Sequence, residues 1–264
     1  MKPAVRMRLR GAAQAAGIHL AISLALAVGA ACLVWGVWYP PPFDRLSGGR
    51  ELILLIVGVD VICGPALTLV VFDRSKPKSE LLKDLSLIAV LQCAALSYGL
   101  WSTFEARPLY LVHEVDRFRV IAKPDYLGVD VSDEIAQLPQ SMRSRWLAGP
   151  VLVGARPAED ARVRGAILME ALRGGRDFAQ RPEYYLPYDE GYALQVTQRA
   201  QPLAQFIDRY PAMAPEAEAL LRGSNVRLKD ALMLPMVQRN DWIAVLDPRG
   251  HPIGFMPGDG FATR

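Results

Sequence analysis

The sequence predicts a membrane protein with three transmembrane α-helices followed by a periplasmic α+β domain. Three observations support this fold class. Nearly all long apolar runs of the 264-residue chain fall before residue 105, and lysine and arginine cluster on one side of these runs. After residue 105 the pattern changes to short β-prone and short helical segments. We therefore divide the chain into a transmembrane region, residues 1–104, and an exported domain, residues 105–264.

Three apolar stretches are long enough to cross a bilayer, whose hydrocarbon core requires about 20 mostly apolar helical residues. They are residues 15–39, 52–72 and 85–104. The first stretch follows a basic start, as a signal peptide would, but it is longer than the apolar core of a signal peptide. It also ends in the interfacial aromatics Trp35, Trp38 and Tyr39 rather than in a small-residue cleavage site. We therefore expect a retained helix.

The distribution of basic residues predicts the orientation, because short cytoplasmic flanks carry an excess of lysine and arginine. The N-terminal flank and the loop at residues 73–84 each carry four, whereas the loop between the first two stretches carries two. These residues are Lys2, Arg6, Arg8 and Arg10, then Arg74, Lys76, Lys78 and Lys83, and finally Arg45 and Arg50. We expect a bacterial inner-membrane protein with a cytoplasmic N-terminus and a periplasmic C-terminal domain.

Charge and cysteine usage exclude several classes for the exported domain. The net charge of +3 divides into +4 for residues 1–104 and −1 for residues 105–264. Without a basic surplus, no nucleic acid is expected as a partner. The three cysteines, Cys32, Cys63 and Cys93, all lie in the apolar stretches. The exported domain therefore has neither a disulfide nor a thiol-based metal or redox motif.

The second apolar stretch carries an acid in its interior, Asp60. A charged side chain at the bilayer centre costs about 3 kcal/mol on insertion scales, so it needs a polar partner or a cavity. Counted by depth from the outer ends, Ser97 and Tyr98 of the third stretch lie nearest, and Gln92 lies a turn deeper. We expect a hydrogen bond from Ser97 or Tyr98 to Asp60, with Gln92 as the alternative. His19 lies too far along the first stretch to reach Asp60 and is expected at the interface.

Gly64, Pro65 and Thr68 follow Asp60 in the same stretch. Pro65 lacks a backbone donor, which predicts a kink over residues 61–64, and Thr68 is near enough to satisfy the freed carbonyl. We interpret these four residues as a polar seam. The default interpretation is a packing seam within the protein. The second is a docking groove for the transmembrane helix of another protein, and the third is a proton or ion path, which a single ionisable group supports poorly.

The exported domain is predicted to be α+β. Glu114 to Arg117 is a predicted turn, and Asp247-Pro-Arg-Gly250 has the composition of a hairpin turn. Residues 181–191 contain aromatics without a period, which indicates a loop pinned to the core. Strands are expected at residues 110–112, 118–122, 231–238, 242–247 and 252–255, and helices at residues 133–137, 157–172, 203–209 and 215–222.

The exported domain lacks the motifs of common catalytic sites: GxSxG, HExxH, a P-loop, GxGxxG or a nucleophilic cysteine. Its two histidines, His113 and His251, do not have the spacing of metal ligands. Asp116 and Arg117 are interpreted as an ion pair in a turn. These absences favour a binding protein over an enzyme, and we expect no cofactor and no metal.

The chain resembles the type IV pilin accessory proteins, the TfpX/TfpZ family. The similarity covers about residues 1–120, and a weaker similarity returns at residues 238–242 and in the hairpin after them. The motifs that carry it are Ile18-His19-Leu20, Trp38-Tyr39-Pro40, Asp60 to Thr68 with Phe72 and Lys76, Lys83-Asp84-Leu85, Gln92, Tyr98-Gly99, Arg107-Pro108 and Asp116-Arg117-Phe118, and then Gln238-Arg239-Asn240-Asp241-Trp242.

The resemblance implies an inner-membrane helper that affects the stability of the major type IV pilin or its incorporation into the pilus. A pilin awaiting assembly has one apolar helix in the membrane and a globular periplasmic head. Gly58, Gly64, Thr68 and Asp60 could pack against such a helix. The partners implied are the major pilin, the lipid bilayer and other pilus assembly proteins. A membrane-anchored periplasmic sensor or ligand-binding module is the alternative function, and a membrane-bound enzyme acting on envelope substrates is a third class.

Overall fold

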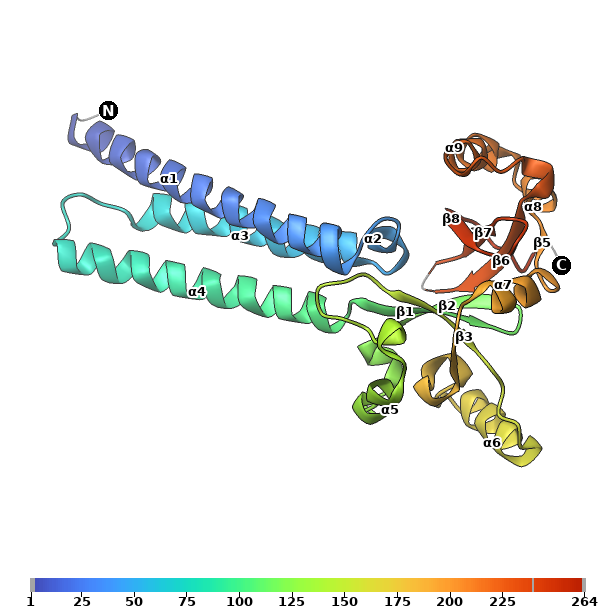
Figure 1. Ribbon diagram of the computed structural model, residues 1–264. Coiled ribbons are helices and arrows are strands. Elements are labelled where there is room, and N and C mark those ends of the chain that lie inside the picture. The colour runs from blue at the N-terminus through green and yellow to red at the C-terminus, as the bar shows by residue number, and fades with distance from the viewer. Residues whose placement is uncertain (1–2, 239, 263–264) are drawn as a thin grey trace. The chain divides into compact units, whose positions relative to one another are not determined.

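The computed structural model describes residues 3–238 and 240–262. Lys2, one of the predicted cytoplasmic cations, and Arg239, part of the weaker resemblance, lie outside the described residues. The chain divides into two compact units (Figure 1). We call Met1–Asp44 with Gly48–Glu105 the helical unit, and Arg45–Ser47 with Ala106–Arg264 the head.

The helical unit contains three helices long and apolar enough to cross a membrane, among the residues that the structure describes. They are α1 (Pro3–Leu33) with its π-helical continuation η1 (Val34–Trp38), α3 (Gly49–Val71) and α4 (Lys78–Glu105), and the short α2 (Phe43–Leu46) follows η1. The helices contain nearly all of the predicted stretches and extend beyond them at the N-terminus and at the start of α4. These extensions are rich in Arg, Lys, Leu and Ala, which are strong helix formers.

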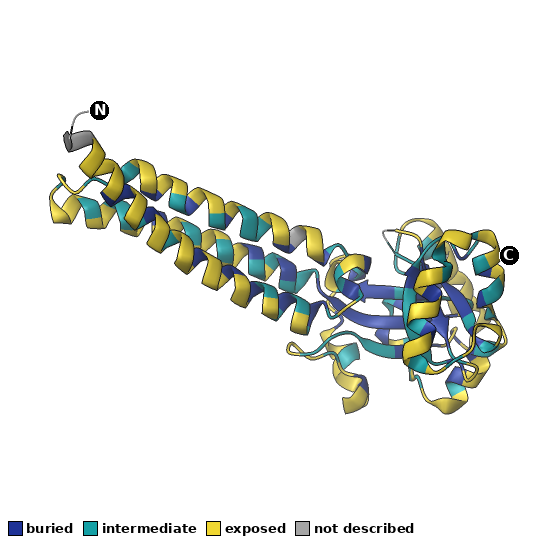
Figure 2. Cartoon of the chain, turned by 90° about the horizontal axis from the view of Figure 1, so that it is seen from above, coloured by how far each residue is buried: buried dark blue, intermediate teal, exposed yellow. Residues whose placement is uncertain are grey.

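In the helical unit α3 packs against both α1 and α4. Near the predicted outer end the Tyr39 hydroxyl donates to the Thr103 carbonyl at 3.0 Å, and the rings of Trp38 and Phe104 lie 5.1 Å apart. Most other side chains of the three helices are exposed on their outward faces, as Figure 2 shows. Exposed apolar side chains over this length are what a lipid environment accommodates.

The head is built around one mixed sheet with the strand order β4-β3-β1-β2-β6-β7-β8, and β5 pairs with β6. The pairs β1/β3 and β2/β6 are parallel, and the others are antiparallel. Strands and helices together form a mixed α/β domain, as the sequence predicts. The strands are β1 (Pro108–Glu114), β2 (Arg117–Ala122), β3 (Val151–Ala155), β4 (Tyr185–Pro187), β5 (Gln201–Pro202), β6 (Leu232–Val237), β7 (Trp242–Leu246) and β8 (Pro252–Pro257).

The helices of the head are short. They are α5 (Ser132–Gln137), α6 (Ala161–Leu172), α7 (Glu190–Thr197), α8 (Leu203–Arg209) and α9 (Ala214–Ser224). Single 3-10 turns occur at η2 (Lys123–Tyr126), η3 (Gln140–Met142), η4 (Phe178–Gln180), η5 (Pro182–Tyr184), η6 (Pro211–Met213) and η7 (Leu228–Asp230).

Two predictions for the head were wrong, and one strand was missed. The helix predicted at 157–172 begins only at Ala161, because the Asp160 carboxylate caps it by accepting from the Arg162 amide at 2.7 Å. Residues 181–191 are not simply a loop, since they contain η5, β4 and the start of α7. Strand β3 was missing from the prediction, although its length equals that of the predicted β7.

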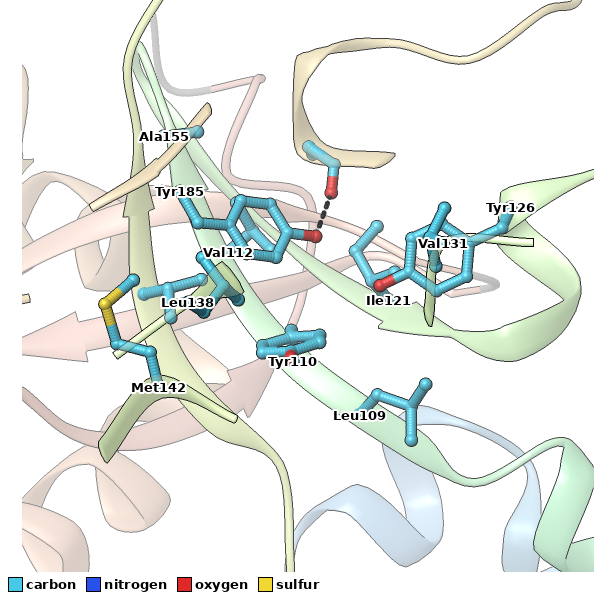
Figure 3. Close-up of a cluster of buried hydrophobic side chains, with 12 residues drawn as sticks. Leu109, Tyr110, Val112, Ile121, Tyr126, Val131, Leu138, Met142, Ala155 and Tyr185 are labelled. Atoms are coloured by element: carbon cyan, nitrogen blue, oxygen red, sulfur yellow. Dashed lines mark hydrogen bonds between the residues drawn. The ribbon is translucent and has the colours of Figure 1, made fainter. Parts of the chain in front are cut away.

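Two hydrophobic cores fill the head. The first lies among β1 to β4 and the segment around α5, and it includes the rings of Tyr110 and Tyr185, which meet edge to face at 5.0 Å (Figure 3). The Tyr185 hydroxyl donates to the Ala179 carbonyl at 2.6 Å, so this tyrosine of residues 181–191 is pinned to the core as expected. The second core joins α8 and α9 to β6, β7 and β8.

Tyr192 of α7 fastens the ends of the parallel strands β1 and β3. Its hydroxyl accepts from the Ala155 amide at 3.0 Å, and the carbonyls of His113 and Ala155 both lie 3.2 Å away as acceptors. The ring occupies the space over Gly154, where an added Cβ would overlap it. A glycine is therefore required in β3 by close packing rather than by backbone conformation.

We predict that Gly154→Ala destabilises the head by about 1–3 kcal/mol, because the methyl group displaces the Tyr192 ring and its hydrogen bonds. The measurement is the urea concentration at the midpoint of unfolding of the full chain in detergent, with the folded fraction determined by pulse proteolysis. Gly165→Ala is the matched control. Gly165 is exposed inside α6 with open space around it, so alanine should leave stability unchanged or raise it by up to about 1 kcal/mol. Equal midpoints for wild type and Gly154→Ala would contradict the packing argument.

Candidate functional site

The buried acid of the helical unit is the centre of the candidate site. Asp60 is 8% exposed on α3, and Gln92 of α4 donates through Nε2 to both its side-chain Oδ1 and its backbone carbonyl, at 3.0 Å each. One carboxamide thus joins two helices through two acceptors of one residue.

The predicted partners Ser97 and Tyr98 do not bond to Asp60. Both side chains are exposed, and the Tyr98 ring lies 5.8 Å from that of Trp101. Gln92, the alternative partner, makes the contact instead. Counting residues from the helix ends gave depth but not rotation about the helix axis, and rotation decides which side chain of α4 faces α3.

Gly64 makes the contact between α3 and α4 possible. The Gln92 carboxamide lies directly over its Cα, where a Cβ would overlap all three terminal atoms of the glutamine. Gly99 of α4 has a similar role, because a Cβ there would come within 2.7 Å of Ile56. By contrast, Gly58 has open space around it and takes no part in this close approach. Small residues at a helix contact are the usual basis of association in lipid.

An apolar groove of about 400 Å³ lies between α3 and α4, and Asp60 and Gln92 are among its lining residues. Its walls are apolar side chains of the two helices, among them the exposed Leu55, Val59 and Leu91. None of the α1 side chains that the structure describes lines this groove, so α1 leaves this face of the pair open. Gln92 Oε1 is buried and accepts no hydrogen bond from the described residues. The groove is thus a mostly apolar surface that includes the Asp60–Gln92 contact.

The predicted seam divides between two faces of α3. Asp60 and Gly64 line the groove toward α4, whereas the Thr68 hydroxyl lies 2.6 Å from Nδ1 of His19 on α1. Eight residues along a helix rotate a side chain by about 80°, which is enough to turn Thr68 to another neighbour. The expected roles of Thr68 in satisfying the carbonyl freed by Pro65, and of His19 at the interface, give way to this contact between helices. Pro65 is not among the groove residues, and α3 continues through it.

The histidines of the head belong to an aromatic cluster. The Tyr188 ring lies 6.5 Å from the His113 ring and 6.1 Å from the His251 ring, so it separates the two imidazoles. Burial lowers the pKa of His113 to about 4, with a weaker opposing effect of Asp116. His113 is therefore neutral near pH 7, and its Nδ1 lies 3.0 Å from the Tyr192 hydroxyl. Within residues 3–238 and 240–262 no three His, Cys, Asp or Glu side chains are grouped for a metal.

A second hollow, of about 430 Å³, lies in the head between the β1–β2 turn, the end of β3 and α6. It is lined by charges of both signs, including Arg117, Arg156, Arg164 and Asp177. Asp116 and Arg117 form the expected ion pair in the turn, at 2.8 Å. Desolvation by burial raises the pKa of Glu114, which also lines this hollow, although the Arg119 charge opposes the shift.

Comparison with known proteins gives the family. A family model described as fimbrial assembly protein FimB matches residues 7–48. The fimbrial assembly protein of serogroup I from Dichelobacter nodosus is 33% identical over 245 residues, which cover 92% of this chain and 93% of the relative. This chain belongs to the fimbrial assembly protein family. The resemblance to pilus accessory proteins is thereby confirmed.

Two further relatives from the same organism belong to other serogroups. The fimbrial assembly protein of serogroup E1 is 32% identical over 245 residues, covering 92% of this chain and 93% of the relative. That of serogroups C1 and C2 is 38% identical over 136 residues, which are 52% of this chain and 98% of the relative. No solved structure matches the chain.

For this member of the fimbrial assembly protein family we predict that Gly64→Ala separates α3 from α4. The added methyl displaces the Gln92 carboxamide and removes the donor of Asp60, at a cost of about 1–3 kcal/mol. A lower melting temperature in detergent micelles would report the loss. Gly58→Ala lies in the same helix with nothing near its Cβ and should melt as the wild type does. Identical melting of the two variants would show that the contact at Gly64 does not limit stability.

Proposed function

We propose that this chain is an inner-membrane accessory protein, a chaperone or assembly factor, that binds or stabilises the major type IV pilin and promotes or modulates pilus assembly. Family membership supports a role in fimbrial assembly, since the relatives are named for that process. The observation that carries the binding step is the open groove between α3 and α4. The proposal treats the chain as a binding protein rather than an enzyme, and other pilus assembly proteins are further candidate partners.

The groove has the properties that a single transmembrane helix needs in a partner. Lipid tails are as apolar as leucine, so helices associate through close packing and hydrogen bonds between helices. Gly64 and Gly99 keep α3 and α4 close together, which sets the depth of the groove and leaves a surface on which a guest helix can pack closely. A pilin helix held there would be shielded from lipid before its transfer to the pilus.

We predict that a photo-crosslinking amino acid at Leu91 or Val59 captures pilin in cells that assemble pili. Both side chains are exposed and line the groove, so they would touch a docked helix. Leu24 on α1 is the matched control, because it is as exposed as these two and lies away from the groove lining. Immunoblotting for pilin identifies the adduct.

The crosslinking experiment has clear contrary outcomes. Equal capture from Leu24 would mean that pilin meets the helices without using the groove. The absence of pilin adducts at all three positions would refute the membrane part of the proposal. Asp60→Ala should in parallel lower pilin co-purification and surface piliation, because the α3–α4 contact loses an acceptor of Gln92.

The alternative function, a membrane-anchored periplasmic sensor or ligand-binding module, is supported by the charged hollow of the head. A sensor would require a signalling partner, because only short segments are predicted on the cytoplasmic side. Capture of a signalling protein rather than pilin in the same crosslinking experiment would favour it.

The proposed orientation makes a separate prediction. With Cys32, Cys63 and Cys93 replaced by alanine, Glu159→Cys in the head should react with an impermeant maleimide in cells whose outer membrane alone is permeabilised. Lys78→Cys, at the start of α4, should react only after the inner membrane is also opened. Both positions are exposed, so a difference in labelling reports the side of the membrane. The opposite labelling order would invert the topology.

A further inference from the structure

The segment that leads into β3 carries an unusual surface for a protein domain. Trp146 is 65% exposed and the adjacent Leu147 is 55% exposed. Arg143 and Arg145 beside them are also exposed, and residues 140–150 contain no acid. Two large apolar side chains thus lie next to two cations at the surface of the head.

Hydrogen bonds and strand pairing fix this segment at one end of the sheet. The Ser144 amide donates to the Tyr110 hydroxyl at 3.2 Å, and the Arg143 Nε donates to the Leu138 carbonyl at 2.8 Å. The parallel register pairs Tyr110 of β1 with Val151 of β3, so both strands begin at the same end. Trp146 and Leu147 therefore lie near the end of the sheet where β1 starts.

The end of the sheet where β1 starts is also the end that the chain connects to α4. Only two residues separate Glu105, the end of α4, from Pro108, the start of β1, so the gap is at most about 10 Å. The interfacial layer of a bilayer adds roughly 5–7 Å outside each side of the hydrocarbon core. Arg45–Ser47, between α1 and α3, also belong to the head, where Gln238 Nε2 donates to Ser47 Oγ at 3.1 Å. In the topology proposed above, these short connections keep the end of the sheet where β1 starts close to the membrane surface.

We infer that Trp146 and Leu147 insert into the lipid interface of the outer leaflet, with Arg143 and Arg145 bound to anionic phospholipid headgroups. Tryptophan favours this layer because its ring is apolar while its N–H can bond to water and headgroups. Basic side chains beside it add attraction to anionic lipid. Two apolar side chains are far less than the roughly 800 Å² per partner of a stable protein interface, which favours lipid over a second protein.

The contact would give the head a third attachment to the bilayer, besides its two chain connections. It would limit rotation of the head about those connections and hold the end of the sheet where β1 starts toward lipid. This inference rests on the membrane topology proposed above but not on the pilin groove.

The test measures the fluorescence of Trp146 itself. In the full chain, Trp35, Trp38, Trp101 and Trp242 are replaced by phenylalanine, and the protein is reconstituted into vesicles of brominated phosphatidylcholine with phosphatidylglycerol. The matched control moves the single tryptophan to Leu194→Trp, with Trp146 also replaced by phenylalanine. Leu194 is also well exposed, at 55% against 65% for Trp146, but it lies on α7, two residues from Tyr192, which binds the opposite end of β3.

We expect Trp146 to be quenched severalfold more strongly by brominated lipid than the control probe, and severalfold less by aqueous acrylamide. Strong quenching of Trp146 by acrylamide without quenching by bromine would overturn the inference. Resistance to both quenchers would also overturn it, because protein contacts would then cover the side chain.

A second probe guards against misfolding of the four-fold tryptophan variant. Leu147→Cys and Leu194→Cys, made with all five tryptophans present and the native cysteines replaced by alanine, are labelled with an environment-sensitive nitrobenzoxadiazole. On vesicles, only the label at 147 should shift its emission to the blue. Equal emission from the two labels would overturn the lipid contact by an independent route.

Discussion

The hydrogen bonds from Gln92 to Asp60 hold the centre of the helical unit. In hydrocarbon no water can satisfy a carboxylate or a backbone carbonyl, so a partner must come from the protein. Gln92 serves both acceptors at once, and it reaches them only because Gly64 leaves room for the carboxamide. This contact, together with the close approach of Gly99 to Ile56, sets the spacing of α3 and α4 and with it the groove.

The same requirement places α1 on a different side of α3. His19 bonds to Thr68 two helical turns from Asp60, so α3 uses separate faces for its two neighbours. The face of the α3–α4 pair left without α1 is the groove in which we place a pilin helix. A polar contact that stabilises the protein and a surface that binds a partner are therefore built from the same residues.

The head relies on aromatic packing rather than on cross-links, which suits a domain with no cysteine. Tyr185 fills one core, and Tyr192 fastens β1 to β3 over Gly154. Burial keeps His113 neutral at physiological pH, so it packs and hydrogen-bonds within this cluster without a charge to solvate. The packed head holds the exposed segment before β3 in a fixed position on the sheet, which the proposed lipid contact requires.

The sequence by itself determined the three apolar helices, the strands β1, β2, β6, β7 and β8, and the importance of Asp60, because length, apolar content and a buried acid are local properties. The tertiary structure alone decided that Gln92 rather than Ser97 or Tyr98 meets Asp60, and that Thr68 turns to His19. It also decided the short strands β3 and β4 and the helix α7. Rotation of a helix about its axis and the pairing of short strands are set by distant neighbours, and a linear pattern carries no record of them.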